Sequence, residues 1–285
     1  MSHGDSSERL VFLRRAIARI EAGATPAGPR REPSQARLPL GPAAGAQPFW
    51  LDAVLGGGLL RGALYEAAPG GPGDQGACCG FALGLAARFA RSHGGAIVWV
   101  IEDFAVHEGG APYGPGLLEW GLDPARLVLV RAADAKSALW ALEEALKCPA
   151  CAAVVGELWS SARHYGQTAA RRLVMAARRG GAPCILTHPA QSGEAFDSHG
   201  AQARFAIFAR PDSSGGLRAS RPTPAQPGFA VQILKTRLEG GRAALPDTNA
   251  RRPLVWTAQE ALFCDPLSFD FSARSGDRIA AARRA

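Results

Sequence analysis

Apolar and polar positions follow one regular pattern through the middle of the chain. Between residues 63 and 187, short runs that are apolar at every position are separated by longer amphipathic segments. Such runs are typical of strands buried on both faces of a parallel sheet, and the segments between them are typical of the covering helices. The pattern predicts strands at 63–67, 96–101, 127–131, 152–155 and 184–187, and helices at 78–91, 134–147 (capped by Asp134) and 168–179.

The pattern changes after residue 191. Two further apolar runs, 204–209 and 229–238, are separated only by a loop rich in Pro, Gly and Ser, without a helix between them. Strands joined in this way are expected to pair antiparallel. The predicted fold class is therefore α/β, with a mostly parallel sheet covered by helices on both faces and antiparallel strands at its C-terminal side.

The N-terminal segment predicts a separate amphipathic helix over residues 7–22. Its apolar positions recur at spacings of three and four, and a Pro-, Gly- and Ala-rich linker follows it. A helix isolated by a linker cannot bury its own apolar stripe, so it should dock on the core, a sister subunit or a partner. The residues of this stripe are Leu10, Leu13, Ile17 and Ile20.

The chain thus divides into four predicted parts. Residues 1–22 form the helix, 23–48 the linker, 49–257 the core, and 258–285 an irregular basic tail.

The chain is basic, with a formal net charge of +7 and a pI of about 9.5. This charge favours anionic partners such as nucleic acid, although an Arg-rich solvated surface explains it equally well. We find no apolar stretch near the roughly 18–20 residues that span a bilayer and no secretory signal, so we expect a cytoplasmic protein with reduced cysteines and no membrane contact. We identify no metal-site motif.

A glycine-rich segment carries the main functional signal. Residues 71–78, GPGDQGAC, follow a predicted strand and precede a predicted helix, and they have the G-x-x-x-x-G frame of a phosphate-binding Walker A loop. The frame glycines are Gly71 and Gly76, but Ala77 and Cys78 stand where a working loop has Lys and Ser or Thr. Asp74 would add a negative charge inside the cradle. A simple strand-to-helix turn is the alternative interpretation.

The second half of a nucleotide site is altered too. The 152–155 run is followed by Gly156 and Glu157, where the Asp of a Walker B strand is expected. Glu157 is displaced by one residue, which in a strand would place it on the other face. We therefore expect no bound cofactor and no ATP hydrolysis.

The order of these segments resembles the RecA/RAD51 core and, more closely, the ImuA family of inducible mutagenesis proteins. The similarity runs over roughly residues 50–245 and rests on the motifs LGGGL (55–59), GALYE (62–66), WVIED (99–103), WGLDPARL (120–127), PCILTH (183–188), RFAI (204–207) and VQILKTR (231–237).

This resemblance implies a function. It implies a non-catalytic accessory protein of translesion synthesis in the SOS response. Its implied partners are an ImuB-like relative of Y-family polymerases and an error-prone C-family DNA polymerase, with RecA, single-stranded DNA and a homo-oligomer as further partners. The N-terminal helix and linker resemble those with which RecA joins its subunits.

Two groups of basic residues are candidate contacts with DNA or a partner. Arg171, Arg172, Arg178 and Arg179 crowd one predicted helix, where a solvated helix face is the alternative. Lys235 and Arg237 resemble the pair that RecA-type proteins place near a neighbour's ATP, and the exposed side of an edge strand is the alternative.

Two other functions stay open at this stage. A divergent RecA-fold, DNA-dependent ATPase would need a cation in place of Ala77. A SulA-like regulator of cell division would act through protein contacts alone.

Overall fold

The computed structural model describes residues 37–43, 48–159, 164–188, 200–210, 227–237 and 250–266. Their elements, in chain order, are β1 (Arg37–Leu38), α2 (Trp50–Val54), β2 (Leu59–Leu60), β3 (Leu64–Pro69), α3 (Gln75–His93), β4 (Ala96–Glu102), α4 (Asp103–Gly109), α5 (Gly114–Glu119), a 3₁₀ turn (Pro124–Arg126), β5 (Leu127–Ala132), α6 (Ala135–Leu146), β6 (Cys151–Glu157), α7 (Gln167–Gly180), β7 (Cys184–Thr187), β8 (Ala203–Arg210), β9 (Gly228–Thr236), β10 (Arg252–Thr257) and β11 (Leu262–Cys264).

One nine-stranded sheet organises the fold, in the order β11-β10-β9-β8-β3-β7-β6-β4-β5. The strands from β8 to β5 in this order are parallel, whereas β8, β9, β10 and β11 pair antiparallel. The predicted fold class is confirmed. The predicted N-cap is also present, because Asp134 Oδ1 accepts a hydrogen bond from Ser137 N at 2.7 Å.

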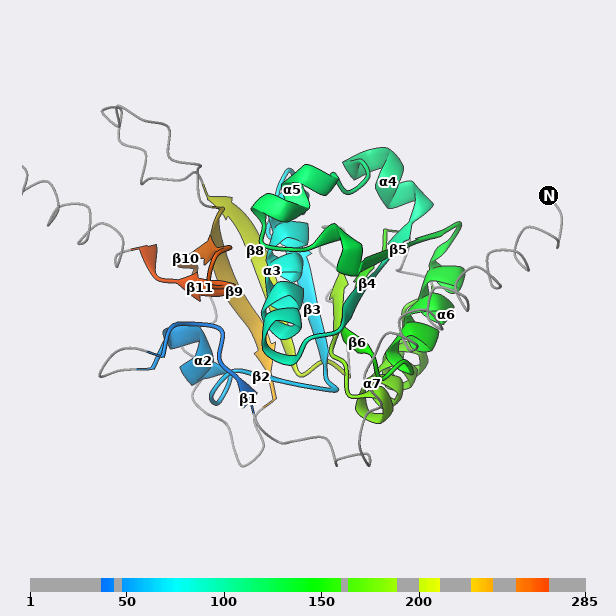
Figure 1. Cartoon of the computed structure of the whole chain (residues 1–285), viewed down its shortest axis with the longest axis horizontal. Helices are drawn as coiled ribbons and strands as arrows, with labels where there is room; N and C mark the ends of the chain where they lie inside the picture. Colours follow the sequence, from blue (N-terminus) through cyan, green and yellow to red (C-terminus); the bar gives the residue numbers. More distant parts are fainter. Residues whose placement is uncertain are drawn as a thin grey trace, which may run out of the picture.

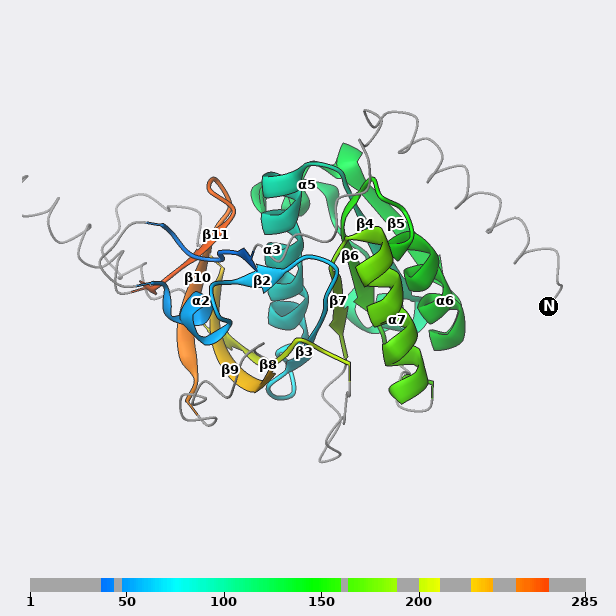
Figure 2. The ribbon, with the colours of Figure 1, turned by 90° about the horizontal axis from the view of Figure 1, so that it is seen from below.

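Helices cover the two faces of the sheet unequally. Figures 1 and 2 show α3 on one face, and α6 and α7 side by side on the other. The central strands β3, β4, β6 and β7 are buried on both sides, and their alternate residues face opposite layers. In β6, for example, Ala153 and Val155 pack on the α3 side, whereas Val154 packs on the side of α6 and α7.

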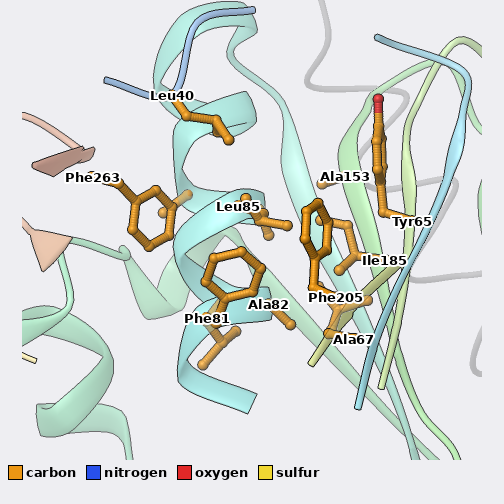
Figure 3. Close-up of a cluster of buried hydrophobic side chains, with 14 of the residues drawn as sticks. Leu40, Tyr65, Ala67, Phe81, Ala82, Leu85, Ala153, Ile185, Phe205 and Phe263 are labelled. Carbon is orange, nitrogen blue, oxygen red and sulfur yellow. The ribbon is translucent and has the colours of Figure 1, made fainter. Parts of the chain in front are cut away.

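The larger core lies around α3 (Figure 3). Phe81 sits at its centre, with its ring 5.4 Å from that of Phe205 in β8 and 5.2 Å from that of Phe263 in β11. Gly84 allows β11 to approach this closely, since a Cβ atom there would lie 2.7 Å from Phe263 Cζ. The antiparallel strands are therefore an integral part of the core.

The packed core extends beyond the range predicted from sequence on both sides. Residues 37–43 fall within the predicted linker, yet Leu40 is fully buried and its carbonyl accepts a hydrogen bond from Phe263 N at 2.9 Å. The buried carboxylate of Asp52 holds the same segment, because it accepts hydrogen bonds from Leu40 N at 2.7 Å and Gly41 N at 3.0 Å. Burial raises the pKa of Asp52, and these two bonds oppose the rise. Among the helices of the described ranges, none is both long and apolar enough to cross a bilayer.

Candidate nucleotide site

The glycine-rich loop lies at the edge of the sheet where the parallel strands end, between β3 and α3 (Figure 1). Gly70 N donates to the carbonyl of Ile207 in β8 at 2.7 Å, which fixes the start of the loop. Gly73 has a φ of +91°, a conformation that favours glycine. The helix begins at Gln75, so the second half of the predicted phosphate frame already belongs to the first turn of α3.

Asp74 fastens this loop to the neighbouring strand. Its Oδ1 accepts a hydrogen bond from Ala209 N of β8 at 2.8 Å. The sequence indicated only that a carboxylate here would repel phosphate. The structure adds that the carboxylate satisfies a backbone donor of β8, so it links the loop to the sheet.

The residues at the lysine and hydroxyl positions supply no polar group for a phosphate. Ala77 packs against the core, and Cys78 is completely buried within it. Burial raises the pKa of the Cys78 thiol, and the carboxylates of Glu157 and Asp74 raise it further. A buried neutral thiol is a poor ligand for a hard cation such as Mg²⁺.

Cys79, one residue further along α3, makes the contact between this helix and the end of β6. Its thiol donates to Glu157 Oε1 at 3.1 Å, and its sulfur accepts from Gln75 Nε2 at 3.6 Å. Burial raises the pKa of both the Cys79 thiol and the Glu157 carboxyl. The thiol and the carboxyl therefore satisfy each other in an apolar setting.

The prediction that Glu157 faces away from the loop is wrong. Glu157 continues the α3-facing series of β6 and reaches Cys79, whereas Gly156 faces α6. A Cβ atom on Gly156 would lie 2.6 Å from Leu186 and 2.8 Å from Leu142. The alternation along β6 therefore places position 157, and not 156, on the face of the loop.

A second buried carboxylate at this edge is bound to the backbone. Glu102, the last residue of β4, accepts a hydrogen bond from Trp159 N at 2.8 Å. Its neighbour Asp103 forms an ion pair with Arg131 at 2.9 Å. The Glu102 contact orders the chain where it leaves β6, next to Glu157.

These side chains do not fit an ATP–Mg²⁺ complex. A working loop places a lysine on the β- and γ-phosphates and a hydroxyl on Mg²⁺. Here the corresponding positions carry a methyl group and a buried thiol, and Glu157 and Asp74 are engaged by protein donors. In the described part of the chain, His, Cys, Asp and Glu form no group of three that could hold a metal ion.

A polar cluster that the sequence did not indicate lies on the opposite face of the sheet. Glu66 of β3 is fully buried and accepts a hydrogen bond from the Tyr165 hydroxyl at 2.5 Å. Arg204 of β8 approaches the other carboxylate oxygen to 3.8 Å, and the ring of His188 lies 5.0 Å from that of Tyr165. Burial, and then the charge of Arg204, lowers the pKa of His188 to about 3. This imidazole is therefore neutral at physiological pH.

The structure keeps the predicted basic residues apart from the loop. All four arginines of α7 are exposed on the outer surface of that helix. Lys235 of β9 lies opposite Arg204 of β8 in the strand register. Arg204 is five residues from Ala209, whose N–H binds Asp74, and this corresponds to about 16 Å along the strand. Arg237 lies further still from the loop. The helix stripe Leu10, Leu13, Ile17 and Ile20 lies outside the described residues.

Together, the strand order and this site define a RecA-like α/β protein whose phosphate loop lacks its lysine and hydroxyl. No family model matches the chain. Two curated relatives, each called Protein ImuA and from two strains of Caulobacter vibrioides, are 32% identical over 198 residues. The matched region covers 67% of this chain and 75% of each relative. The chain belongs to the ImuA family.

Among solved structures, the RadB recombinase covers 75% of this chain and matches over 96% of its own length. The two are 17% identical, with a TM-score of 0.46.

Proposed function

We propose that this protein is a non-catalytic RecA-like accessory protein of an error-prone translesion synthesis complex in the SOS response to DNA damage. Its membership in the ImuA family supports an association with inducible mutagenesis. The single observation that carries the non-catalytic part is the altered phosphate loop, in which Ala77 replaces the lysine and Cys78 is buried.

Its proposed role is to recruit or stabilise two partners. These are an ImuB-like relative of Y-family polymerases and an error-prone C-family DNA polymerase. RecA and single-stranded DNA are proposed as further contacts. A RecA-like core without ATP turnover can act as a scaffold, because its contacts do not need to cycle with hydrolysis.

The first test measures ATP binding and hydrolysis by the purified full chain, with and without single-stranded DNA. We expect neither at millimolar ATP, with active RecA as the positive control. DNA-stimulated hydrolysis would refute the non-catalytic role and favour a divergent ATPase.

The second test concerns the pathway and uses a deletion strain complemented with the wild-type gene. We expect damage-induced mutation frequency to fall in the deletion strain, and the ImuB-like protein to co-purify with the tagged chain. Normal mutagenesis together with division arrest on overexpression would instead favour a SulA-like regulator.

A further inference from the structure

The outer surface of α6 and α7 combines exposed apolar side chains with an excess of positive charge. α6 and α7 pack side by side against the sheet, as Figure 2 shows, and between them lies a groove of about 380 Å³. Leu139, Trp140, Ala169 and Leu173 form its apolar lining, and Lys136 and Arg172 are among its charged residues. The Trp140 side chain remains 38% exposed.

Beside the groove, α7 carries an exposed apolar residue that is surrounded by arginines. Met175 is 54% exposed, and its helix positions place it on the same stripe as the groove-lining Arg172, three residues before it. The residues three and four positions before and after Met175 are all arginine, and α7 contains no Asp or Glu. These four exposed residues are Arg171, Arg172, Arg178 and Arg179.

Among the described residues, the acids beside this surface balance only part of its positive charge. Glu143 of α6 pairs with Arg172 at 2.6 Å and with Lys147 at 3.5 Å, so its carboxylate is already shared by two cations. Glu144 pairs with Lys147 at 2.7 Å. The surface therefore offers both apolar anchoring points and an electrostatic field that attracts anions.

We infer that the groove between α6 and α7, with the Met175 face of α7, binds an acidic amphipathic helix of a partner protein. The apolar side chains of that helix would pack on Trp140 and Met175, while its carboxylates face the arginines. Charge complementarity decides between occupants. The chain's own segment 7–22 carries Arg14, Arg15 and Arg19 beside its apolar stripe, and these would meet arginines of the same sign.

Nucleic acid fits this surface less well than such a helix. Phosphates would be attracted by the arginines and a base could stack on Trp140, but a nucleic acid has no aliphatic side chain to cover an exposed methionine and the aliphatic floor of the groove. An amphipathic helix satisfies both requirements, because its apolar residues recur every three or four positions, as they do in helix-in-groove complexes. The inference stands whether or not the partner belongs to a mutagenesis complex.

The test selects 16-residue peptides, randomised at every position, against the immobilised full chain. We expect enriched sequences with a net negative charge and apolar residues spaced three and four apart. A synthetic enriched peptide, labelled with fluorescein, is then titrated with the chain and its anisotropy measured. Enrichment of neutral or basic sequences, or no enrichment at all, would overturn the inference.

Variants locate the binding surface. Met175→Glu should weaken peptide binding at least tenfold, Trp140→Ala at least tenfold, and Arg178→Glu at least fivefold. Arg91→Glu is the matched control for Arg178→Glu, since both are exposed arginines in the last turn of a helix, and it should leave binding within twofold. If Trp140→Ala destabilises α6, Met175→Glu still tests the binding surface, because an exposed Glu beside four arginines favours the helix and should not unfold it. Binding that is unchanged in Met175→Glu would place the peptide elsewhere and overturn the inference.

Two further measurements separate the other occupants. A labelled 30-nucleotide single strand should bind wild type and Arg178→Glu equally, and a selective loss in the variant would assign the surface to nucleic acid. Sedimentation equilibrium should give the same oligomeric state for wild type and Met175→Glu. Self-association that disappears in the variant would assign the surface to a second copy. Either of these two results would refute the inference.

Discussion

Replacing Gly156 tests which residue at the end of β6 faces the phosphate loop. The glycine is packed against α6, and a Cβ atom would come within 2.8 Å of side-chain carbons of both Leu142 and Leu186. Both contacts involve the ends of flexible leucines, so a methyl group can be accommodated by small shifts. Overpacking of this kind costs about 1–3 kcal/mol, and the lower entropy of the unfolded Ala variant returns about 0.4–1 kcal/mol. Gly156→Ala should therefore cost about 1 kcal/mol of unfolding free energy.

Gly156→Asp should be far more damaging. Its carboxyl would be pushed into the same leucine-lined layer, where burial of a polar group without a partner costs at least about 2 kcal/mol beyond the steric cost. We expect a total loss of at least about 3 kcal/mol, which is a large part of the stability of an ordinary domain. The contrast with Glu157 is direct, since that carboxyl lies one residue further on and is accommodated opposite Cys79.

The assay is urea unfolding of the purified chain at pH 7.5, followed by far-UV circular dichroism, with Glu157→Asp as a control that keeps a carboxyl on the loop face. Wild type should be the most stable, Gly156→Ala slightly less stable, and Gly156→Asp the least stable. A Gly156→Asp variant within 1 kcal/mol of wild type would show that position 156 faces open space. The assignment of Glu157 to the face of the loop would then be wrong.

Three further predictions concern buried polar groups. Asp52→Ala removes the acceptor of two buried backbone N–H groups and should lower the free energy of urea unfolding by about 3 kcal/mol. The control Asp123→Ala loses one exposed hydrogen bond and should cost about 1 kcal/mol. Equal costs for the two variants would contradict the anchoring role of Asp52. Tyr165→Phe should cost about 2 kcal/mol, because Glu66 loses a buried donor, and an effect below 0.5 kcal/mol would disprove that bond's contribution. Burial raises the pKa of Glu157 above its ordinary 4.5, so the folded state binds the carboxyl proton of Glu157 more tightly than the unfolded chain does. The stability that this proton contributes is fully present below pH 4.5 and is lost as the pH rises through the raised pKa. The stability of wild type relative to Glu157→Gln should therefore fall across that window, and a constant difference from pH 4 to pH 8 would refute the shift.

The sheet was predictable because burial on both faces leaves a strong signal. The run 184–187 matches β7 residue for residue, and 96–101 differs from β4 only at its last residue. Nearly every position of such a strand is apolar, so its ends are usually marked by the first polar or turn residue. The antiparallel pairing of β8 and β9 followed equally well from the absence of a helix between them.

The short outer strands could not be predicted in this way. β1 has two residues and β11 has three, which is too few for any periodicity. Their positions depend on contacts across the fold, such as the bond from Phe263 N to the carbonyl of Leu40. Sequence alone therefore placed both segments outside the core.

At the candidate site, the missing groups were visible in the sequence but the contacts that replace them were not. Ala77 and Cys78 stand out against the glycine frame, so their positions needed no structure. The partner of Glu157 depends on where α3 begins, because the rotation of its first turn decides whether Cys78 or Cys79 faces β6. The helix begins at Gln75, which turns Cys78 into the core and Cys79 toward the strand.

Three contacts at the ends of the parallel strands explain how this edge can be ordered without a ligand. Asp74 binds β8, Glu157 binds Cys79, and Glu102 binds the backbone of Trp159. In a phosphate site, acidic groups here depend on Mg²⁺ and lysine to offset their mutual repulsion. In this chain each of these carboxylates instead accepts from a donor of the protein itself. We therefore expect that a lysine restored at position 77 alone does not rebuild a nucleotide site, because the loop would still be fastened through Asp74 and the acid at 157 would still be buried against a thiol.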